Sequence, residues 1–572
     1  MDETQKANQG GRDDLSSWAL EIQKNIYTHD DDFIHSIKFY FPNDFIRVNA
    51  ELETFGHEVV NHLEPLVKEN NLAVNLPRLE AYSPVGERID QIVHHPAYVQ
   101  AGNIIYGTKI MEKMSRPGGL AECLSLLFLS AQTGEAGHNC PAACSAGIIR
   151  VLQKTPDFPD KSYYLEKLTT PSFQSGFTGA QFLTEIQGGS DVGLNGAYAS
   201  QDENNVWRIH GEKWFCSNAG ANLIFMTARY DKKIPGTKGL GLFLVPAEWN
   251  GSKNNYTIRR LKDKIGTRSM ATGEIDFHGA YALAIGPVED GIHLVMDNVL
   301  HLSRLFNSFC VLGMARRAYS IARAYAQHRK VFSHTIVNYP LVKENLARIK
   351  AENTAMLAGI FATTRLQDQF DTGNVSGKNV KLLLRLLVNI QKYLTALWSV
   401  EHIHHALDVL AGNGTIEIFS PLPRLLRDGI VCENWEGTHN VLRAQVHKDI
   451  LKYGIDAIFI SFMETEIKRL NKYAQHLHPL MEELDNLKQQ LDSFRQAGTE
   501  LQSLQIRIIV DRMVVLYCAL MLLEEAVDQT KAGLSFSKLD CYNYFCMLHL
   551  EKNETSYDDD YLELISRIVV ND

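Results

Sequence analysis

The residues best suited to chemistry are Trp435, Glu436, Gly437 and Thr438, an aromatic-Glu-Gly-Thr sequence in the C-terminal half of the chain. A carboxylate beside a large aromatic ring is partly shielded from water, and desolvation raises the pKa of a carboxyl group toward neutral pH. Such a group can act as a general base on a weakly acidic C–H bond. Taken alone, a Glu-Gly-Thr sequence is equally typical of a turn that caps a helix.

A second segment has the composition of a phosphate cradle. Phe182, Leu183, Thr184 and Glu185 lead into Gly188, Gly189, Ser190 and Asp191. Adjacent glycines let backbone N–H groups come close to an anion, and the hydroxyl of Ser190 adds a donor. The chain has neither a dinucleotide-binding Gly-x-Gly-x-x-Gly turn nor a P-loop, so this is a different kind of cradle. The alternative is a plain glycine-rich turn between two elements.

These motifs, in this order, resemble those of the acyl-CoA dehydrogenase family, in which a Tyr/Trp-Glu-Gly-Thr segment supplies the catalytic base. The similarity covers roughly residues 85 to 450 and is closest to the AidB-like branch of the family. The segments that indicate this branch are 94–98, 137–141, 187–193, 261–269 and 422–427.

The resemblance implies FAD as the cofactor. It places Thr184 near the pyrimidine edge of the flavin and Ser190 near the pyrophosphate. Phe215 then covers one face of the ring and Ser217 donates a hydrogen bond to N5, the atom that receives hydride. The other residues expected at the cofactor are Phe182, Leu183, Gly189, Arg329, Phe332, Asp408, Gly412, Thr438 and Asn440.

Arg329 and Phe332 match an Arg-x-x-Phe pair whose guanidinium reaches the pyrophosphate of a neighbouring subunit. A forked guanidinium suits a diphosphate well. This chain departs from the commoner pattern, since Val331 and Ser333 stand where Thr and Gly are frequent. Likewise, Asp408 replaces a frequent Gln, and Ala411 replaces the first of two glycines.

The reaction implied is α,β-desaturation of an acyl-CoA thioester in fatty acid metabolism. Glu436 removes the α-proton, and flavin N5 accepts the β-hydride. Electrons then pass to an electron-transfer flavoprotein or to oxygen. Arg304 and Gly437 are expected to bind substrate or to support the site. The alternative function is a flavin-containing acyl-CoA-binding protein, or an AidB-type stress-response or DNA-protecting protein, with little turnover.

Composition narrows the possible partners. The 572-residue chain has a formal net charge of −10, which argues against a general affinity for nucleic acid or anionic membranes. No apolar run is long enough to span a membrane, and no targeting signal is visible, so a cytoplasmic location is expected. The nine cysteines form no Cys-x-x-Cys pair, and His402, His404 and His405 do not converge on one point of a helix. We therefore expect no metal site.

The predicted fold is mainly helical with a small antiparallel β domain. The expected parts are a flexible leader (1–35), a helical domain (36–178), the β domain (179–288), a helical bundle (289–455) and an added helical domain (456–572). The last part carries 11 basic and 20 acidic residues, a net charge of −9. Its apolar stripe of Leu484, Leu487, Leu491 and Phe494 must be buried. The resemblance implies a homodimer or homotetramer.

Overall fold

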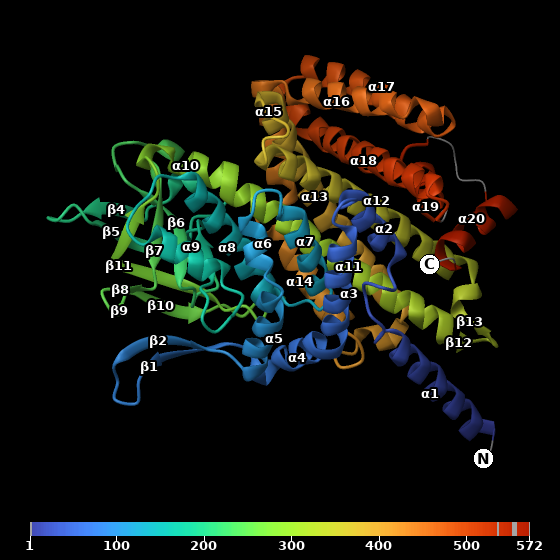
Figure 1. Cartoon of the computed structure of the whole chain (residues 1–572), viewed down its shortest axis with the longest axis horizontal. Coiled ribbons are helices and arrows are strands. Elements are labelled where there is room, and N and C mark those ends of the chain that lie inside the picture. The colour runs from blue at the N-terminus through green and yellow to red at the C-terminus, as the bar shows by residue number, and fades with distance from the viewer. Residues whose placement is uncertain (1–2, 535–536, 552–556, 571–572) are drawn as a thin grey trace. The chain divides into compact units, whose positions relative to one another are not determined.

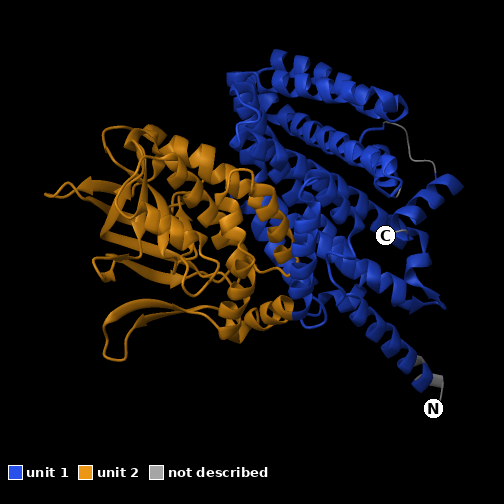
Figure 2. Ribbon diagram, viewed as in Figure 1, with its two compact units in different colours: residues 1–61, 307–572 blue, residues 62–306 orange. Residues whose placement is uncertain are grey.

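The computed structural model describes residues 3–534, 537–551 and 557–570, and the chain divides into two compact units. Unit 1 comprises residues 1–61 and 307–572, and unit 2 comprises residues 62–306 (Figure 2). The expected class, mainly helical with a small β domain, is confirmed. Among the described residues, no helix combines the length and apolar content that crossing a membrane requires.

Unit 2 begins with helices and one β-hairpin, in which β1 (Arg78–Tyr82) pairs antiparallel with β2 (Arg88–Val93). This hairpin lies within the segment that was expected to be wholly helical. The helices of this part are α4 (Glu64–Asn70), α5 (Pro96–Gly107), α6 (Ile110–Ser115), α7 (Leu120–Ala131), α8 (Ala136–Lys154) and α9 (Lys161–Thr169). Helix α7 is apolar on almost all sides and is buried along its whole length.

A seven-stranded sheet follows in unit 2, with strand order β10-β11-β5-β4-β6-β3 and with β7 paired to β6 and β11. The short hairpin of β8 (Glu248–Trp249) and β9 (Ser252–Lys253) and the helix α10 (Gly291–Leu294) also belong to this unit. The strands of the sheet are β3 (Gly179–Phe182), β4 (Tyr198–Gln201), β5 (Trp207–Ser217), β6 (Leu223–Arg229), β7 (Leu240–Pro246), β10 (Tyr256–Leu261) and β11 (Thr272–Ala284). Most pairs are antiparallel, as expected, but β3 pairs with β6 in parallel. The chain returns from β3 to β6 through β4 and β5, which allows this parallel pairing.

Where its residues are described, unit 1 is helical apart from the small hairpin of β12 (Lys330–Val331) and β13 (His334–Thr335) (Figure 1). Its N-terminal helices are α1 (Glu3–Glu21), α2 (Asp31–Tyr40) and α3 (Phe45–Glu58). The bundle helices are α11 (His301–His328), which begins in unit 2, α12 (Pro340–Asp371), α13 (Lys378–Val409), α14 (Leu422–Asn434) and α15 (His439–Tyr453). The C-terminal helices are α16 (Ile455–Arg469), α17 (Ala474–Gln496), α18 (Thr499–Lys531), α19 (Ser537–His549) and α20 (Asp559–Val570).

The C-terminal helices pack on the bundle and on one another. Helices α18, α19 and α20 all contact α12, while α17 packs on α16 and α18. The apolar stripe of α17, which consists of Leu484, Leu487, Leu491 and Phe494, is buried. The acidic surplus of this part therefore lies on a helical layer whose apolar face is already covered.

The N-terminal segment differs from the flexible leader that its polar composition suggested. Residues 3–21 form α1, and the indole of Trp18 is only 4% exposed because it stacks on Phe419 with ring centroids 4.7 Å apart. One buried aromatic residue anchors the otherwise polar helix, and the polar composition alone did not reveal this.

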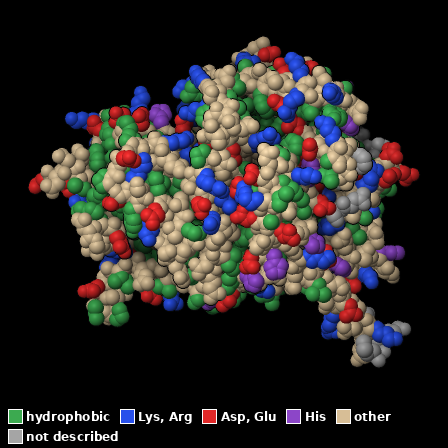
Figure 3. All heavy atoms as spheres, viewed as in Figure 1, with side chains coloured by type: hydrophobic (Ala, Val, Ile, Leu, Met, Phe, Trp, Pro, Cys, Tyr) green, Lys and Arg blue, Asp and Glu red, His purple; other side chains and the backbone are tan. Residues whose placement is uncertain are grey.

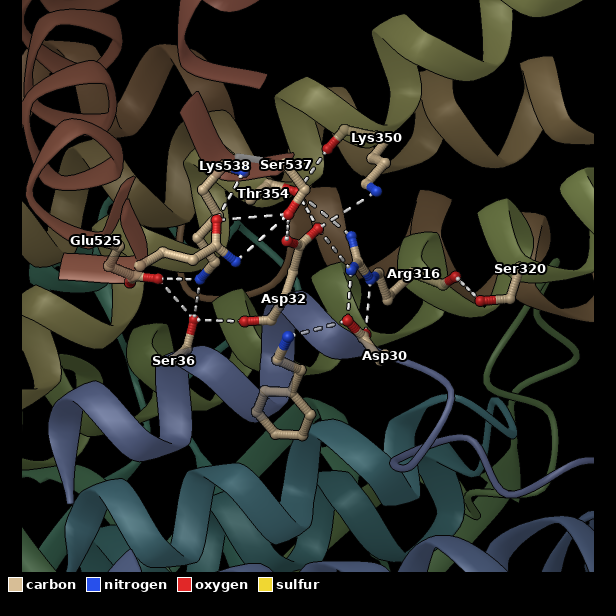
Figure 4. Close-up of polar contacts among 12 residues, drawn as sticks. Asp30, Asp32, Ser36, Arg316, Ser320, Lys350, Thr354, Glu525, Ser537 and Lys538 are labelled. Carbon is tan, nitrogen blue, oxygen red and sulfur yellow. Dashed lines mark hydrogen bonds and ion pairs between the residues drawn. The ribbon is translucent and has the colours of Figure 1, made fainter. Parts of the chain in front are cut away.

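A buried network of charged side chains joins the N-terminal, central and C-terminal helices of unit 1 (Figure 4). Arg316 donates a hydrogen bond from Nε to Asp30 at 2.7 Å, and Ser537 donates one to Asp32 at 3.2 Å. Lys538 is paired with Glu525 and donates to Ser36 at 2.8 Å. Buried charges are tolerated only when they are paired in this way.

Candidate functional site

Glu436 lies on a strained turn between α14 and α15. Helix α14 ends at Asn434, Trp435 is extended, and α15 begins at His439. Between them, Glu436 has a φ of 52° and Gly437 has a φ of 110°. A left-handed conformation is natural for glycine and costly for glutamate, and such strain often marks functional sites.

Polar contacts hold this turn and its carboxylate in place. The side-chain amide of Asn307 donates to Oε2 of Glu436 at 2.8 Å and to the carbonyl oxygen of Cys432 at 3.0 Å. The buried ammonium of Lys392 donates to the carbonyl oxygens of Glu433 and Gly437, at 2.9 and 3.0 Å. The carboxylate is half-buried and has a fixed donor on one oxygen. Sequence reasoning missed Asn307 and Lys392, because both lie on helices distant in sequence from the motif.

Other predicted cofactor residues of unit 1 lie at helix ends. Thr438 and Asn440 are exposed at the start of α15, where Oδ1 of Asn440 accepts a hydrogen bond from Arg443. Asp408 is exposed in the last turn of α13, and Gly412 is exposed in the 3-10 turn that follows. In that turn, Ala411 has a φ of 50°. Alanine thus takes the left-handed conformation at a position where glycine was expected.

Arg329 follows the C-terminal end of α11, and Phe332 occupies the tip of the β12-β13 hairpin. Phe332 and Ser333 have φ values of 51° and 72°, and the Phe332 ring is 86% exposed. The guanidinium of Arg329 is half-buried and forms no ion pair or hydrogen bond with the described residues. The forked guanidinium of Arg329 and the exposed ring of Phe332 therefore lie within the same short segment, where both could contact a ligand.

In unit 2 the glycine-rich segment is tightly folded. A Cβ atom on Gly189 would lie 2.5 Å from Oγ1 of Thr184, so only glycine fits there. Gly188 has a φ of 136°. Ser190 and Gly189 are exposed, while Phe182 is fully buried in the sheet core, so only its backbone can face a ligand.

A buried ion pair sets the position of this segment, and sequence reasoning missed it. Lys213 donates from Nζ to Oε1 of Glu185 at 2.7 Å and to the carbonyl oxygen of Leu183 at 3.2 Å. Glu185 also accepts hydrogen bonds from the backbone N–H groups of Gly196 and Ala197. Burial lowers the pKa of Lys213, and the carboxylate of Glu185 opposes that shift. Only the nearness of these residues to Thr184 and Phe215 in the sequence hinted at their role.

Strand β5 brings Phe215 and Ser217 beside the glycine-rich segment. The backbone N–H of Trp214 donates to the carbonyl oxygen of Thr184 at 2.9 Å, which links the two segments directly. Phe215 is 50% exposed, with Nζ of Lys262 4.8 Å from the centre of its ring. Ser217 is half-buried at the end of the strand, opposite Thr272. An aromatic face and a hydroxyl group are therefore available on one strand.

The remaining candidates are less accessible. Arg304 is buried in α11. His402 is buried and bonds Asn353 and Glu352, at 2.8 and 2.5 Å. Among the described residues, no group of three or more His, Cys, Asp or Glu side chains is arranged to hold a metal ion.

Comparisons with known proteins identify the family to which the chain belongs. Residues 22–175 match the adaptive response protein AidB N-terminal domain, residues 180–280 the acyl-CoA dehydrogenase middle domain, and residues 289–451 the acyl-CoA dehydrogenase C-terminal domain. The chain belongs to the acyl-CoA dehydrogenase family, an enzyme family, and to its AidB-like branch.

Individual relatives agree with this assignment. The chain is 28% identical to acyl-CoA dehydrogenase family member 11 of Caenorhabditis elegans, over 88% of this chain and 84% of that protein. It is 29% identical to the putative acyl-CoA dehydrogenase AidB of Escherichia coli K12, over 70% and 74% of the two chains.

Solved structures are similar as well. The structure of C. elegans ACDH-11 in complex with C11-CoA has a TM-score of 0.86 and 25% identity, and it covers 95% of both chains. An acyl-CoA dehydrogenase from Bacillus anthracis complexed with FAD has a TM-score of 0.72 at 16% identity, covering 92% of this chain and 94% of the other. At 16% identity, the similarity to the Bacillus anthracis protein establishes only the fold.

Proposed function

We propose that this protein is an FAD-dependent acyl-CoA dehydrogenase that introduces an α,β double bond into an acyl-CoA thioester. The observation that carries the proposal is the strained turn at Glu436, whose carboxylate is half-buried and held by Asn307 at 2.8 Å. A base aimed at a C–H bond needs this combination of fixed direction and partial shielding from water.

The residues present fit a flavin dinucleotide. In unit 2, Thr184, Gly189 and Ser190 would hold the flavin and its phosphates, since the site beside Thr184 accepts no side chain larger than glycine. Phe215 would lie against the ring, and Ser217 would donate to N5. In unit 1, the guanidinium of Arg329 has no ion pair or hydrogen bond with the described residues and would bind a diphosphate through two donors. In unit 2, FAD would also contact the backbone groups of Phe182 and Leu183. In unit 1, FAD would also contact Gly412 and the side chains of Phe332, Asp408, Thr438 and Asn440.

In this mechanism, Glu436 accepts the α-proton of the substrate on its carboxylate. Asn307 donates to Oε2 of Glu436 and so fixes the direction of the carboxylate. The backbone N–H of Glu436 would donate to the thioester carbonyl oxygen, where a donor stabilises developing enolate charge. Bound FAD supplies the hydride-accepting chemistry at the β-carbon. Lys392 fixes the carbonyl oxygen of Gly437 and so limits movement of the whole turn.

The decisive experiment is reduction of bound flavin by an acyl-CoA, measured as loss of its visible absorbance. The complex of the nematode relative makes C11-CoA the first compound to test. Glu436→Gln keeps the shape of the side chain but cannot accept the proton. It should retain FAD and slow bleaching by at least about 10² to 10⁴-fold. Bleaching at the normal rate in this variant would exclude Glu436 as the base.

A second candidate function is acyl-CoA binding or an AidB-type stress response without turnover, which the match to the AidB N-terminal domain favours. Against DNA binding, basic and acidic side chains are interspersed on the face drawn in Figure 3, and the net charge is −10. Binding of C11-CoA without any flavin bleaching would favour this second function. For the dehydrogenase we propose a cytoplasmic location, a homodimer or homotetramer, and an electron-transfer flavoprotein or oxygen as electron acceptor.

A further inference from the structure

Helix α1 precedes every segment that the family models match, since the first of these begins at residue 22. Its inward face follows helical spacing, with Gly11, Asp14, Leu15 and Trp18 at least partly buried, while its other side is exposed. This face packs within unit 1 on the segments that carry Arg329 and Gly412.

Trp18 connects α1 to both of these segments. Its indole stacks on Phe419, meets the ring of Tyr325 edge-on at 5.7 Å, and donates to the carbonyl oxygen of Ile321 at 3.1 Å. The hydroxyl of Tyr325 in turn accepts a hydrogen bond from the amide of Asn413 at 3.0 Å. The last turn of α11, which leads to Arg329, is thus tied to the turn that contains Gly412.

One helical turn earlier, α1 reaches the residue after Arg329. Oδ2 of Asp14 accepts a hydrogen bond from the backbone N–H of Lys330 at 3.0 Å. The backbone of Arg329 is fixed on either side, by the carbonyl oxygen of Tyr325 at 2.8 Å and the N–H of Ile336 at 2.9 Å. Asp14 therefore holds Lys330, the first residue of the β12-β13 hairpin, which directly follows Arg329.

Next to this contact, α1 has no side chain. A Cβ atom on Gly11 would lie 3.5 Å from Nη1 of Arg329, whereas one on Gly10 would meet nothing within 4 Å. Two adjacent glycines are unfavourable inside a helix, because they add conformational freedom to the unfolded chain. At Gly11, therefore, no side chain of α1 covers the guanidinium.

We propose that α1 is a clamp for the diphosphate end of FAD. Asp14 and Trp18 position the Arg329 and Gly412 segments, and the bare backbone at Gly11 leaves room for the diphosphate on Arg329. This inference rests on the proposed function, because it needs FAD to bind at Arg329. It assigns Asp14 and Trp18 as positioning residues and gives a role to a helix outside the segments that define the family.

The test measures the FAD dissociation constant of full-length apoprotein by flavin fluorescence, with thermal unfolding of each apoprotein as a check on folding. Asp14→Ala removes the acceptor of the Lys330 N–H and should weaken FAD about 3- to 10-fold, the value of one hydrogen bond. Asp14→Asn keeps an acceptor and should restore most of the affinity. Asp13→Ala is the matched control, since among the described residues Asp13 accepts a hydrogen bond only from Gln9, on the exposed side of α1.

A second pair of variants tests whether the missing side chain at Gly11 matters for FAD binding. Gly11→Leu would cover the guanidinium and should weaken FAD about 10-fold or more, whereas Gly10→Leu enters open space and should not. If Arg329→Ala weakens FAD while Asp14→Ala and Gly11→Leu do not, α1 is not a clamp. If FAD binds and Arg329→Ala has no effect, the inference fails and the proposed function stands. Apoprotein that takes up no FAD would overturn both.

Discussion

Asn307 and Glu436 are joined by a hydrogen bond of 2.8 Å from the side-chain amide to Oε2, although 129 positions separate them in the sequence. The same amide bonds the carbonyl oxygen of Cys432 in the last turn of α14. One side chain of α11 therefore ties the end of α14 to the carboxylate that follows it. This contact directs a residue whose backbone is already strained.

The contact predicts that Asn307→Ala slows flavin reduction by C11-CoA without releasing FAD. Loss of direction at the reacting group can cost as much as about 10²-fold in rate, and we expect a loss of about 10-fold or more. Asn434→Ala is the control, because the exposed side chain of Asn434 bonds, within the described part of the chain, only the carbonyl oxygen of Ile430. Equal bleaching rates in the two variants would show that Asn307 does not direct the carboxylate.

Buried histidines of unit 2 predict loss of stability in mild acid. Burial lowers the pKa of His138 to about 3 and that of His94 to about 4, and both imidazoles stack on Tyr98. Below pH 6.5 the unfolded chain binds protons that the folded chain does not. The free energy of unfolding should therefore fall as the pH drops from about 6.5 toward 4, and should be unaffected by these groups above that range.

His138→Gln checks this prediction, since the amide can still donate to the carbonyl oxygen of Tyr98, as Nε2 does at 2.8 Å. Urea unfolding at pH 7.5 and pH 5 should show a smaller acid loss in this variant than in the wild type. His404→Gln, at an exposed position, should change nothing. An unchanged acid loss in His138→Gln would mean that other groups cause it.

The order of the helical and β segments and the place of the turn that carries Glu436 were predictable from sequence, because they depend on local patterns such as those at 435–438 and 188–190. The supporting contacts were not. Asn307, Lys392 and the Glu185–Lys213 pair act through tertiary packing, which leaves no trace in residue spacing. The polar composition of residues 1–35 predicts a flexible leader and does not predict helix α1. A single buried Trp18 outweighs that composition once Tyr325 and Phe419 are brought beside it.

The buried network of unit 1 predicts how firmly the C-terminal helices are attached. Lys538→Met leaves Glu525 buried without its cation, which should cost about 3 to 5 kcal/mol of the free energy of unfolding. The double variant Lys538→Met with Glu525→Leu removes both charges and should recover most of that loss. Denaturant unfolding of the wild type, Lys538→Met, Glu525→Leu and the double variant measures the coupling. Additive losses in the double variant would mean that the pair is not coupled.

Phe332 predicts self-association. The Phe332 ring is 86% exposed at a hairpin tip, three residues from Arg329, whose guanidinium has no partner among the described residues. Covering such a ring with a second copy would remove apolar surface from water. We expect a homodimer or homotetramer in which a second copy covers this hairpin. Phe332→Ser should therefore lower the solution mass measured by light scattering and weaken FAD retention together. Leu341→Ser is the control, because Leu341 is also exposed but lies at the start of α12. A wild-type protein that is monomeric and still holds FAD would contradict the prediction that a second copy is needed at this hairpin. Submicromolar DNA binding at about 0.15 M salt, where nonspecific binders show roughly 10⁻⁴ to 10⁻⁶ M, would instead favour the stress-response function.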